Sequence, residues 1–288
     1  MSTIIENIKR RVVRVLEHIA WNKQYKTLIS APRKTNFLLD AEWYKGKKIL
    51  MMVPHADDEL ISSYTVLRYA DDLTVYYCGF TGSDQTEENR ITRGAEISRL
   101  CSELNVKMIK GDGKCDNLYE VIKDGGYDAI LLPSIVDWHE EHRRISYMVS
   151  DVCTNLGIRP EIYSYSVTVP NESGKIVLCV PMNKEQLGEK YDLFNKIYVS
   201  QKFMPIERLK LNERVNGYYA GCFAAETFIK YYYEEWYKMV TSSLSLENKA
   251  DTKVMIFARD LKNNLNNLVS IRQISYMFYN WLEEGGEG

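Results

Sequence analysis

The chain has 288 residues, of which 45% are hydrophobic, and a formal net charge of −2. This length and apolar content are sufficient for one large domain with a full core and an added segment or two. The near-neutral charge provides no basic footprint for nucleic acid. No run of about 20 apolar residues is present, so no membrane-spanning helix is predicted.

The six cysteines form no Cys-x-x-Cys pair and lie in apolar or mixed segments, which is typical of small buried side chains. The N-terminus has neither the apolar core nor the small-residue cleavage site of an export signal. We therefore expect reduced thiols and a cytoplasmic location.

Residues 1–30 predict an N-terminal helical extension, because Ile5, Ile8 and Val12 recur at helical spacing among several basic residues. We expect this helix to pack on the body with those three side chains buried. The alternative is a helix that lies on an anionic membrane surface, because such helices combine a basic polar face with an apolar one.

From about residue 47 the pattern alternates between short apolar runs and amphipathic segments. It predicts strands over 49–53, 73–80, 106–109 and 129–132, and helices over 59–69, 87–104 and 140–156. Alternation of this kind indicates an α/β fold, with a Rossmann-like, mainly parallel sheet flanked by helices.

After residue 160 the pattern is less regular. It predicts two strands, 161–169 and 175–180, around a turn, and then a helix over 184–201. A helical extension is expected over 229–288, which leaves a central domain over 31–228.

Two polar clusters follow apolar runs. His55-Ala56-Asp57-Asp58-Glu59 comes after the run at 48–53, and Asp137-Trp138-His139-Glu140-Glu141-His142 comes after the run at 129–133. Three of the four histidines of the chain lie in these clusters. The carboxyl ends of strands are where open α/β sheets bind ligands. Two histidines and an aspartate suit a divalent metal, and a neighbouring carboxylate suits a base, so the sequence predicts a metallohydrolase.

The spacing within each cluster suggests roles. His55 and Asp58 are three residues apart and can converge on one point at a helix start. Asp57 then points elsewhere and can act as the general base on a water molecule. One of His139 and His142 would be the third ligand, and the other would assist an oxyanion or a leaving amine. The residues alone leave open which is which.

These clusters resemble the motifs of the PIG-L / LmbE-like N-acetylglucosamine deacetylases. The family's first motif is an apolar strand followed by His-Pro-Asp-Asp-Glu, and its last metal motif is His-x-Asp-His, which corresponds here to His139-Glu140-Glu141-His142. This chain has Ala56 in place of the proline and Glu141 in place of the aspartate before the last histidine. Further matches between and after these motifs are Thr81-Gly82, Arg93-Gly94-Ala95-Glu96, Tyr198-Val199-Ser200-Gln201 and Glu226-Thr227-Phe228.

The resemblance implies His55, Asp58 and His142 as zinc ligands. It also implies Asp57 as the general base, and His139 as the group that stabilises the oxyanion or protonates the leaving amine.

It implies in addition that Arg93 lies near the sugar, and that 31–228 is the deacetylase domain. The expected reaction is removal of the acetyl group from an N-acetylated amino sugar held in a small-molecule conjugate. The cofactor is Zn²⁺ or another divalent metal such as Fe²⁺, which two histidines and a carboxylate also suit. The alternatives are hydrolysis of another small amide or N-acyl group, and a non-catalytic sugar- or nucleotide-binding module.

Overall fold

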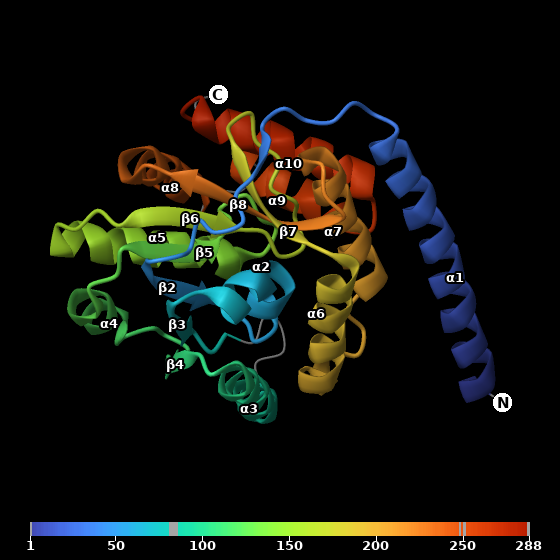
Figure 1. The fold of residues 1–288 in the computed structure, drawn as a ribbon, viewed down its shortest axis with the longest axis horizontal. Helices are drawn as coiled ribbons and strands as arrows, with labels where there is room; N and C mark the ends of the chain where they lie inside the picture. Colours follow the sequence, from blue (N-terminus) through green and yellow to red (C-terminus); the bar gives the residue numbers. More distant parts are fainter. Residues whose placement is uncertain (1, 81–85, 248, 250–251, 287–288) are drawn as a thin grey trace.

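The structure is a computed structural model that describes residues 2–80, 86–247, 249 and 252–286, with the side chains of the first helix described from Val12 onward. In this part of the chain, eight strands form one sheet in the order β1-β7-β8-β6-β5-β2-β3-β4 (Figure 1). The strands are β1 (Phe37–Leu39), β2 (Lys48–Val53), β3 (Asp72–Tyr77), β4 (Lys107–Lys110), β5 (Ala129–Pro133), β6 (Glu161–Tyr165), β7 (Val177–Met182) and β8 (Ala224–Tyr231).

The helices lie on both faces of this sheet (Figure 1). They are α1 (Ser2–Ile29), α2 (Asp58–Tyr69), α3 (Glu87–Leu104), α4 (Leu118–Gly125), α5 (Glu140–Leu156), α6 (Lys184–Ile197), α7 (Ile206–Ala220), α8 (Tyr233–Glu247), α9 (Lys253–Asn263) and α10 (Leu268–Glu283), with a short 3₁₀ turn at Val199–Gln201. The predicted α/β fold with a mainly parallel sheet is confirmed. Within the described ranges, no helix combines the length and apolar character needed to cross a bilayer.

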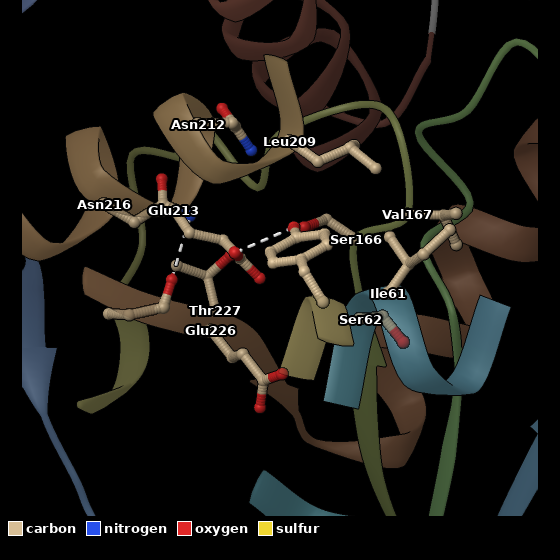
Figure 2. Close-up of a pocket in the computed structure, with 12 residues that line it drawn as sticks. Ile61, Ser62, Ser166, Val167, Leu209, Asn212, Glu213, Asn216, Glu226 and Thr227 are labelled. Carbon is tan, nitrogen blue, oxygen red and sulfur yellow. Dashed lines mark hydrogen bonds between the residues drawn. The ribbon is translucent and has the colours of Figure 1, made fainter. Parts of the chain in front are cut away.

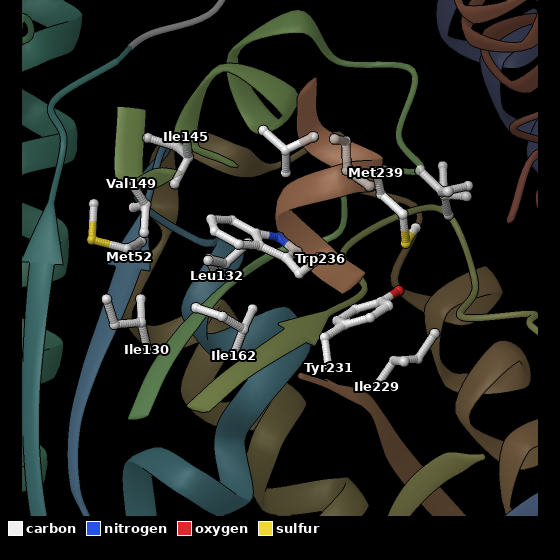
Figure 3. Packing of buried hydrophobic residues seen from close by; sticks show 14 of the residues in the cluster. Met52, Ile130, Leu132, Ile145, Val149, Ile162, Ile229, Tyr231, Trp236 and Met239 are labelled. Atoms are coloured by element: carbon white, nitrogen blue, oxygen red, sulfur yellow. The ribbon is translucent and has the colours of Figure 1, made fainter. Parts of the chain in front are cut away.

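Both faces of the sheet are buried, because successive residues of its central strands enter different cores. Leu50 and Met52 of β2 belong to the core under α5 and α8, whereas Ile49 and Met51 belong to the core under α2, α3 and α6. Figure 3 shows the first core, where Trp236 of α8 lies among side chains of the sheet and α5. Strands buried on both faces appear in sequence as continuous apolar runs, which is why β2 and β5 were predictable.

The second half of the sheet differs from the sequence expectation. The two strands expected around a turn, β6 and β7, do not pair with each other, because β8 lies between them and runs antiparallel to both. The expected strand 161–169 ends at Tyr165, and the expected helix 184–201 ends at Ile197. Four elements were not predicted at all, namely β1, α4, α7 and β8. The expected helical extension over 229–288 is wrong at its start, because residues 229–231 belong to strand β8.

The N-terminal helix α1 forms as expected, but the predicted burial of Val12 is wrong. Val12, Val15, Leu16 and Ile19 are 52–60% exposed. Contact with the body comes from the later turns, where Trp21 is buried against Leu211 and Leu268. The side chains of Ile5 and Ile8 lie outside the described residues.

Candidate metal centre

The two polar clusters meet at one edge of the sheet. Strands β2 and β5 are parallel neighbours, so their carboxyl ends lie side by side. His55 follows β2, and His142 lies in the first turn of α5, which follows β5. The prediction that these histidines stand at the ends of neighbouring strands is confirmed.

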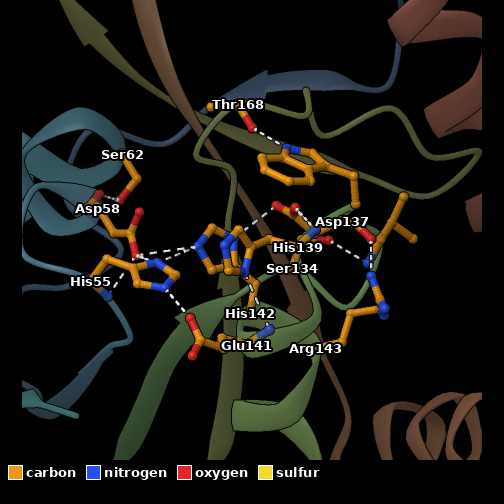
Figure 4. Close-up of polar contacts among 12 residues, drawn as sticks. His55, Asp58, Ser62, Ser134, Asp137, His139, Glu141, His142, Arg143 and Thr168 are labelled. Carbon is orange, nitrogen blue, oxygen red and sulfur yellow. Dashed lines mark hydrogen bonds and ion pairs between the residues drawn. The ribbon is translucent and has the colours of Figure 1, made fainter. Parts of the chain in front are cut away.

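Three ligand-type atoms converge at this point (Figure 4). His55 Nδ1 lies 3.2 Å from Asp58 Oδ2 and 3.1 Å from His142 Nε2. His142 Nε2 lies 3.3 Å from Asp58 Oδ2. Ligands at 2.0–2.1 Å around a tetrahedral zinc ion would be separated by roughly 3.3 Å, so the spacing of the three atoms suits such an ion.

His139 lies against the same group. Its ring centroid is 4.6 Å from that of His55 and 5.0 Å from that of His142. One ring nitrogen from each of the three histidines lies within 4.8 Å of the others, so this histidine group can hold a metal ion. Asp58 adds a carboxylate at the same point, and only one histidine need remain outside the ligand set.

The local backbone explains how Asp58 reaches the histidines. Asp57 adopts φ 122°, a conformation that side-chain-bearing residues rarely occupy, and α2 begins at the next residue. This turn directs the Asp58 carboxylate back to accept a hydrogen bond of 2.9 Å from the His55 backbone N–H. Strain of this kind persists only where the surrounding structure holds it, and it is characteristic of functional sites.

The site is arranged to stabilise positive charge where its atoms converge. Burial lowers the pKa of His142, but Asp58 and Asp137 outweigh it and raise this pKa well above its ordinary value. Burial also lowers the pKa of His55, and there Asp58 and Glu141 outweigh it. The negative charge of carboxylates that stabilises protonated imidazoles would also stabilise a divalent cation at this point.

Asp57 differs from its neighbour. Its side chain is 4% exposed, and among the described residues its carboxylate has no hydrogen bond or ion pair. Burial and the adjacent Asp58 charge raise its pKa to about 7, against the opposing effect of Arg93. Arg93 is half-buried on α3, close enough for its charge to favour the ionised carboxylate. A carboxyl that titrates near neutrality is suited to proton transfer.

His139 has a different electrostatic environment from the other two histidines. Burial, followed by the charges of His142 and His55, lowers its pKa to about 4. Its Nδ1 accepts a hydrogen bond of 3.3 Å from the Glu141 backbone N–H and caps helix α5. His139 is therefore neutral near pH 7, with its proton on Nε2.

Two of the motif matches come together beside the site. Glu96 accepts hydrogen bonds from the Ser200 backbone N–H and hydroxyl, at 2.8 and 2.6 Å. The Tyr198 hydroxyl donates a hydrogen bond to Glu59. The Thr81-Gly82 match lies outside the described residues.

Glu226 has a role that the sequence did not reveal. Helix α2 is interrupted at Ser63, whose φ and ψ are non-helical, so nearby backbone groups lose their helical partners. The Glu226 carboxylate accepts hydrogen bonds from the Tyr64 and Thr65 backbone N–H groups at 2.7 and 2.9 Å. Lys190 donates to the Ile61 carbonyl at 2.6 Å and to Glu226 at 2.7 Å. Together they fix the helix that carries Asp58.

This anchor lies beside a small cavity of about 10 Å³ between α2, α7 and β8 (Figure 2). Glu213, Glu226 and Asn216 line it together with apolar side chains of α2 and α7. A volume of that size admits at most a water molecule. The cavity is therefore too small to be a substrate pocket.

No protein-family model matches the chain, and no curated protein matches it. Solved structures do. A deacetylase of teicoplanin biosynthesis matches with a TM-score of 0.51 at 12% identity, covering 64% of this chain and 97% of the other. A triple mutant of a deacetylase from that pathway matches with a TM-score of 0.50 at 13% identity, covering 64% and 98%.

The N,N′-diacetylchitobiose deacetylase of Pyrococcus horikoshii matches with a TM-score of 0.50 at 16% identity, covering 75% of this chain and 93% of the other. Nearly the whole of each of these proteins is matched, and the remainder of this chain is additional to them. At identities this low, the matches show a shared fold and do not show a shared activity. The chain has the fold of these deacetylases, and the sequence resemblance had implied a deacetylase fold.

Proposed function

We propose that this chain is a metal-dependent hydrolase that removes the acetyl group from an N-acetylated amino sugar. The observation that carries the proposal is the mutual spacing of 3.1–3.3 Å among His55 Nδ1, Asp58 Oδ2 and His142 Nε2. Beside them stands the Asp57 carboxylate, which has no partner among the described residues. The shared fold with deacetylases of diacetylchitobiose and of teicoplanin biosynthesis supports the choice of an acetylated amino sugar.

His55, Asp58 and His142 would hold the ion, which we take to be Zn²⁺ or Fe²⁺, since two imidazoles and one carboxylate suit both. When bound, such an ion supplies Lewis acidity, which acidifies water and polarises a carbonyl group.

The protein's own groups would manage the protons. Asp57 would accept the proton of the attacking water and then deliver it to the leaving amine, and a pKa of about 7 suits both transfers. His139 is neutral near pH 7, because its pKa is lowered to about 4. It would therefore enter the reaction as a hydrogen-bond donor through Nε2 to the oxyanion, and not as a proton donor. Arg93 would bind the sugar conjugate near Asp57.

The test combines metal content with product analysis. We expect the purified chain to hold one divalent ion and to release acetate from at least one member of a panel of N-acetylglucosamine conjugates. Metal without acetate release, together with cleavage of other small amides, would indicate a different amide hydrolase. Sugar binding with neither metal nor turnover would indicate a binding module and overturn the proposal.

A further inference from the structure

Asp137 is the carboxylate on which the second histidine cluster is built. It is 1% exposed, and its Oδ2 lies 3.0 Å from His142 Nδ1. Its Oδ1 accepts a hydrogen bond of 2.8 Å from the His139 backbone N–H. The Asp137 side chain therefore holds both the His142 imidazole and the backbone of the loop that carries His139 (Figure 4).

The position of Asp137 is itself fixed by side chains of helices α5 and α8. Its carbonyl oxygen accepts a hydrogen bond of 2.8 Å from Arg143 Nη1, and Arg143 is 1% exposed. The Arg143 guanidinium is paired with Glu247 at the end of α8, where Nε lies 3.0 Å from both carboxylate oxygens. Tyr147 donates to the same carboxylate at 3.0 Å. A buried guanidinium with a two-oxygen partner permits little movement of the loop.

We propose that Asp137 is a positioning residue that sets the tautomer and the orientation of His142. A carboxylate can only accept, so it holds the proton of a neutral imidazole on Nδ1 and leaves the Nε2 lone pair free. Nε2 is the atom that lies 3.1 Å from His55 Nδ1 and 3.3 Å from Asp58 Oδ2. The inference rests on the proposed function, in that it treats His142 as a metal ligand.

If Asp137 had a purely structural role, Asp137→Asn would leave zinc binding unchanged. Asparagine has the same shape and can still accept the hydrogen bond from the His139 N–H. It would then direct an N–H group at His142 Nδ1, and the imidazole proton would have to move to Nε2. Substitution by asparagine therefore preserves the loop and removes the tautomer control, as in other carboxylate–histidine pairs.

The experiment compares the wild-type chain with Asp137→Asn. The control is Asp128→Asn, which changes a carboxylate that accepts from the Lys48 N–H at the opposite end of β2. Zinc affinity is measured by competition with a chromogenic chelator, and Co²⁺ spectra report the ligand geometry. We expect Asp137→Asn to bind zinc about 10–100-fold more weakly and to alter the Co²⁺ spectrum. The control should match the wild type in both.

A second measurement needs no variant. Long-range ¹H–¹⁵N correlation spectra of the zinc-loaded wild-type chain should show the His142 proton on Nδ1, and a chain with four histidines makes the assignment tractable. A proton on Nε2, or full zinc affinity in Asp137→Asn, would overturn the inference. A wild-type chain that binds no metal would instead overturn the proposed function.

Discussion

Side-chain exposure differs between two regions, namely the sheet edge with the three histidines and the N-terminal helix α1. At the sheet edge, charged groups such as Asp58 and Asp137 are at most 3% exposed and hydrogen-bonded. On α1, apolar groups such as Leu16 and Ile19 are 60% exposed. Burying charge costs free energy unless each group is paired, so the sheet edge has a single arrangement that the fold must hold. The described face of α1 has no such constraint, because its apolar side chains are exposed.

The largest effect is expected from breaking the convergent group itself. Asp58→Ala should abolish metal binding and turnover together, because it removes a ligand and the one carboxylate that both imidazoles share. Metal content by mass spectrometry and acetate release are the measurements. Asp71→Ala, which changes an exposed carboxylate paired with Lys45, is the control. Full metal content in Asp58→Ala would exclude this residue as a ligand.

Asp57→Asn should keep the metal and lose turnover. The substitution preserves shape and removes the proton acceptor, so kcat should fall by about 10²–10⁴-fold. KM should change little, because the residue acts in the transition state. Activity near that of the parent would move the search for the base to Glu59 and Glu141.

His139→Ala separates the third histidine from the two proposed ligands. If His139 donates to the oxyanion, its removal should leave the metal in place and lower kcat by about 10²–10³-fold, as for one oxyanion donor. Metal content and kcat are measured on the same sample. Loss of the metal would indicate that His139 is a ligand, and His142 would then be the candidate donor to the oxyanion.

Arg93→Ala should act mainly on substrate binding. Hydrogen bonds to a charged group contribute about 1.5–3 kcal/mol, so KM should rise by at least about tenfold while the metal stays bound. Steady-state kinetics over a range of substrate concentrations check this. An unchanged KM would place the sugar away from α3.

The smallest effect on stability is expected on α1. Leu16→Glu should change the free energy of unfolding by no more than about 0.5 kcal/mol, because the side chain is already exposed. By contrast, Leu131→Ala, in a fully buried position of β5, should cost about 2–5 kcal/mol. Denaturant unfolding measures both. A large loss in Leu16→Glu would mean that α1 packs against the body through this face.

The same variant tests contact with a membrane surface. If α1 lies on anionic lipid, Leu16→Glu should weaken co-sedimentation with anionic vesicles, in a salt-sensitive way. Leu244→Glu, at a 43% exposed position of α8, is the matched control. Equal sedimentation of the parent and both variants would contradict contact through this face of α1.

The sequence by itself determined the α/β class and the position of the two clusters at strand ends. Both signals are local: continuous apolar runs mark strands buried on two faces, and His55 and Asp58 are close enough along the chain to converge within one turn. Only the tertiary structure decided what depends on distant partners. It brought His142 Nε2 to within 3.1 Å of His55 Nδ1 across 87 positions, and it inserted β8 between β6 and β7. It also gave Asp137 its imidazole partner and left Val12 exposed. Helical spacing of apolar residues is the same whether or not another surface covers them. The partners of a buried carboxylate depend on tertiary packing, which the local sequence does not indicate.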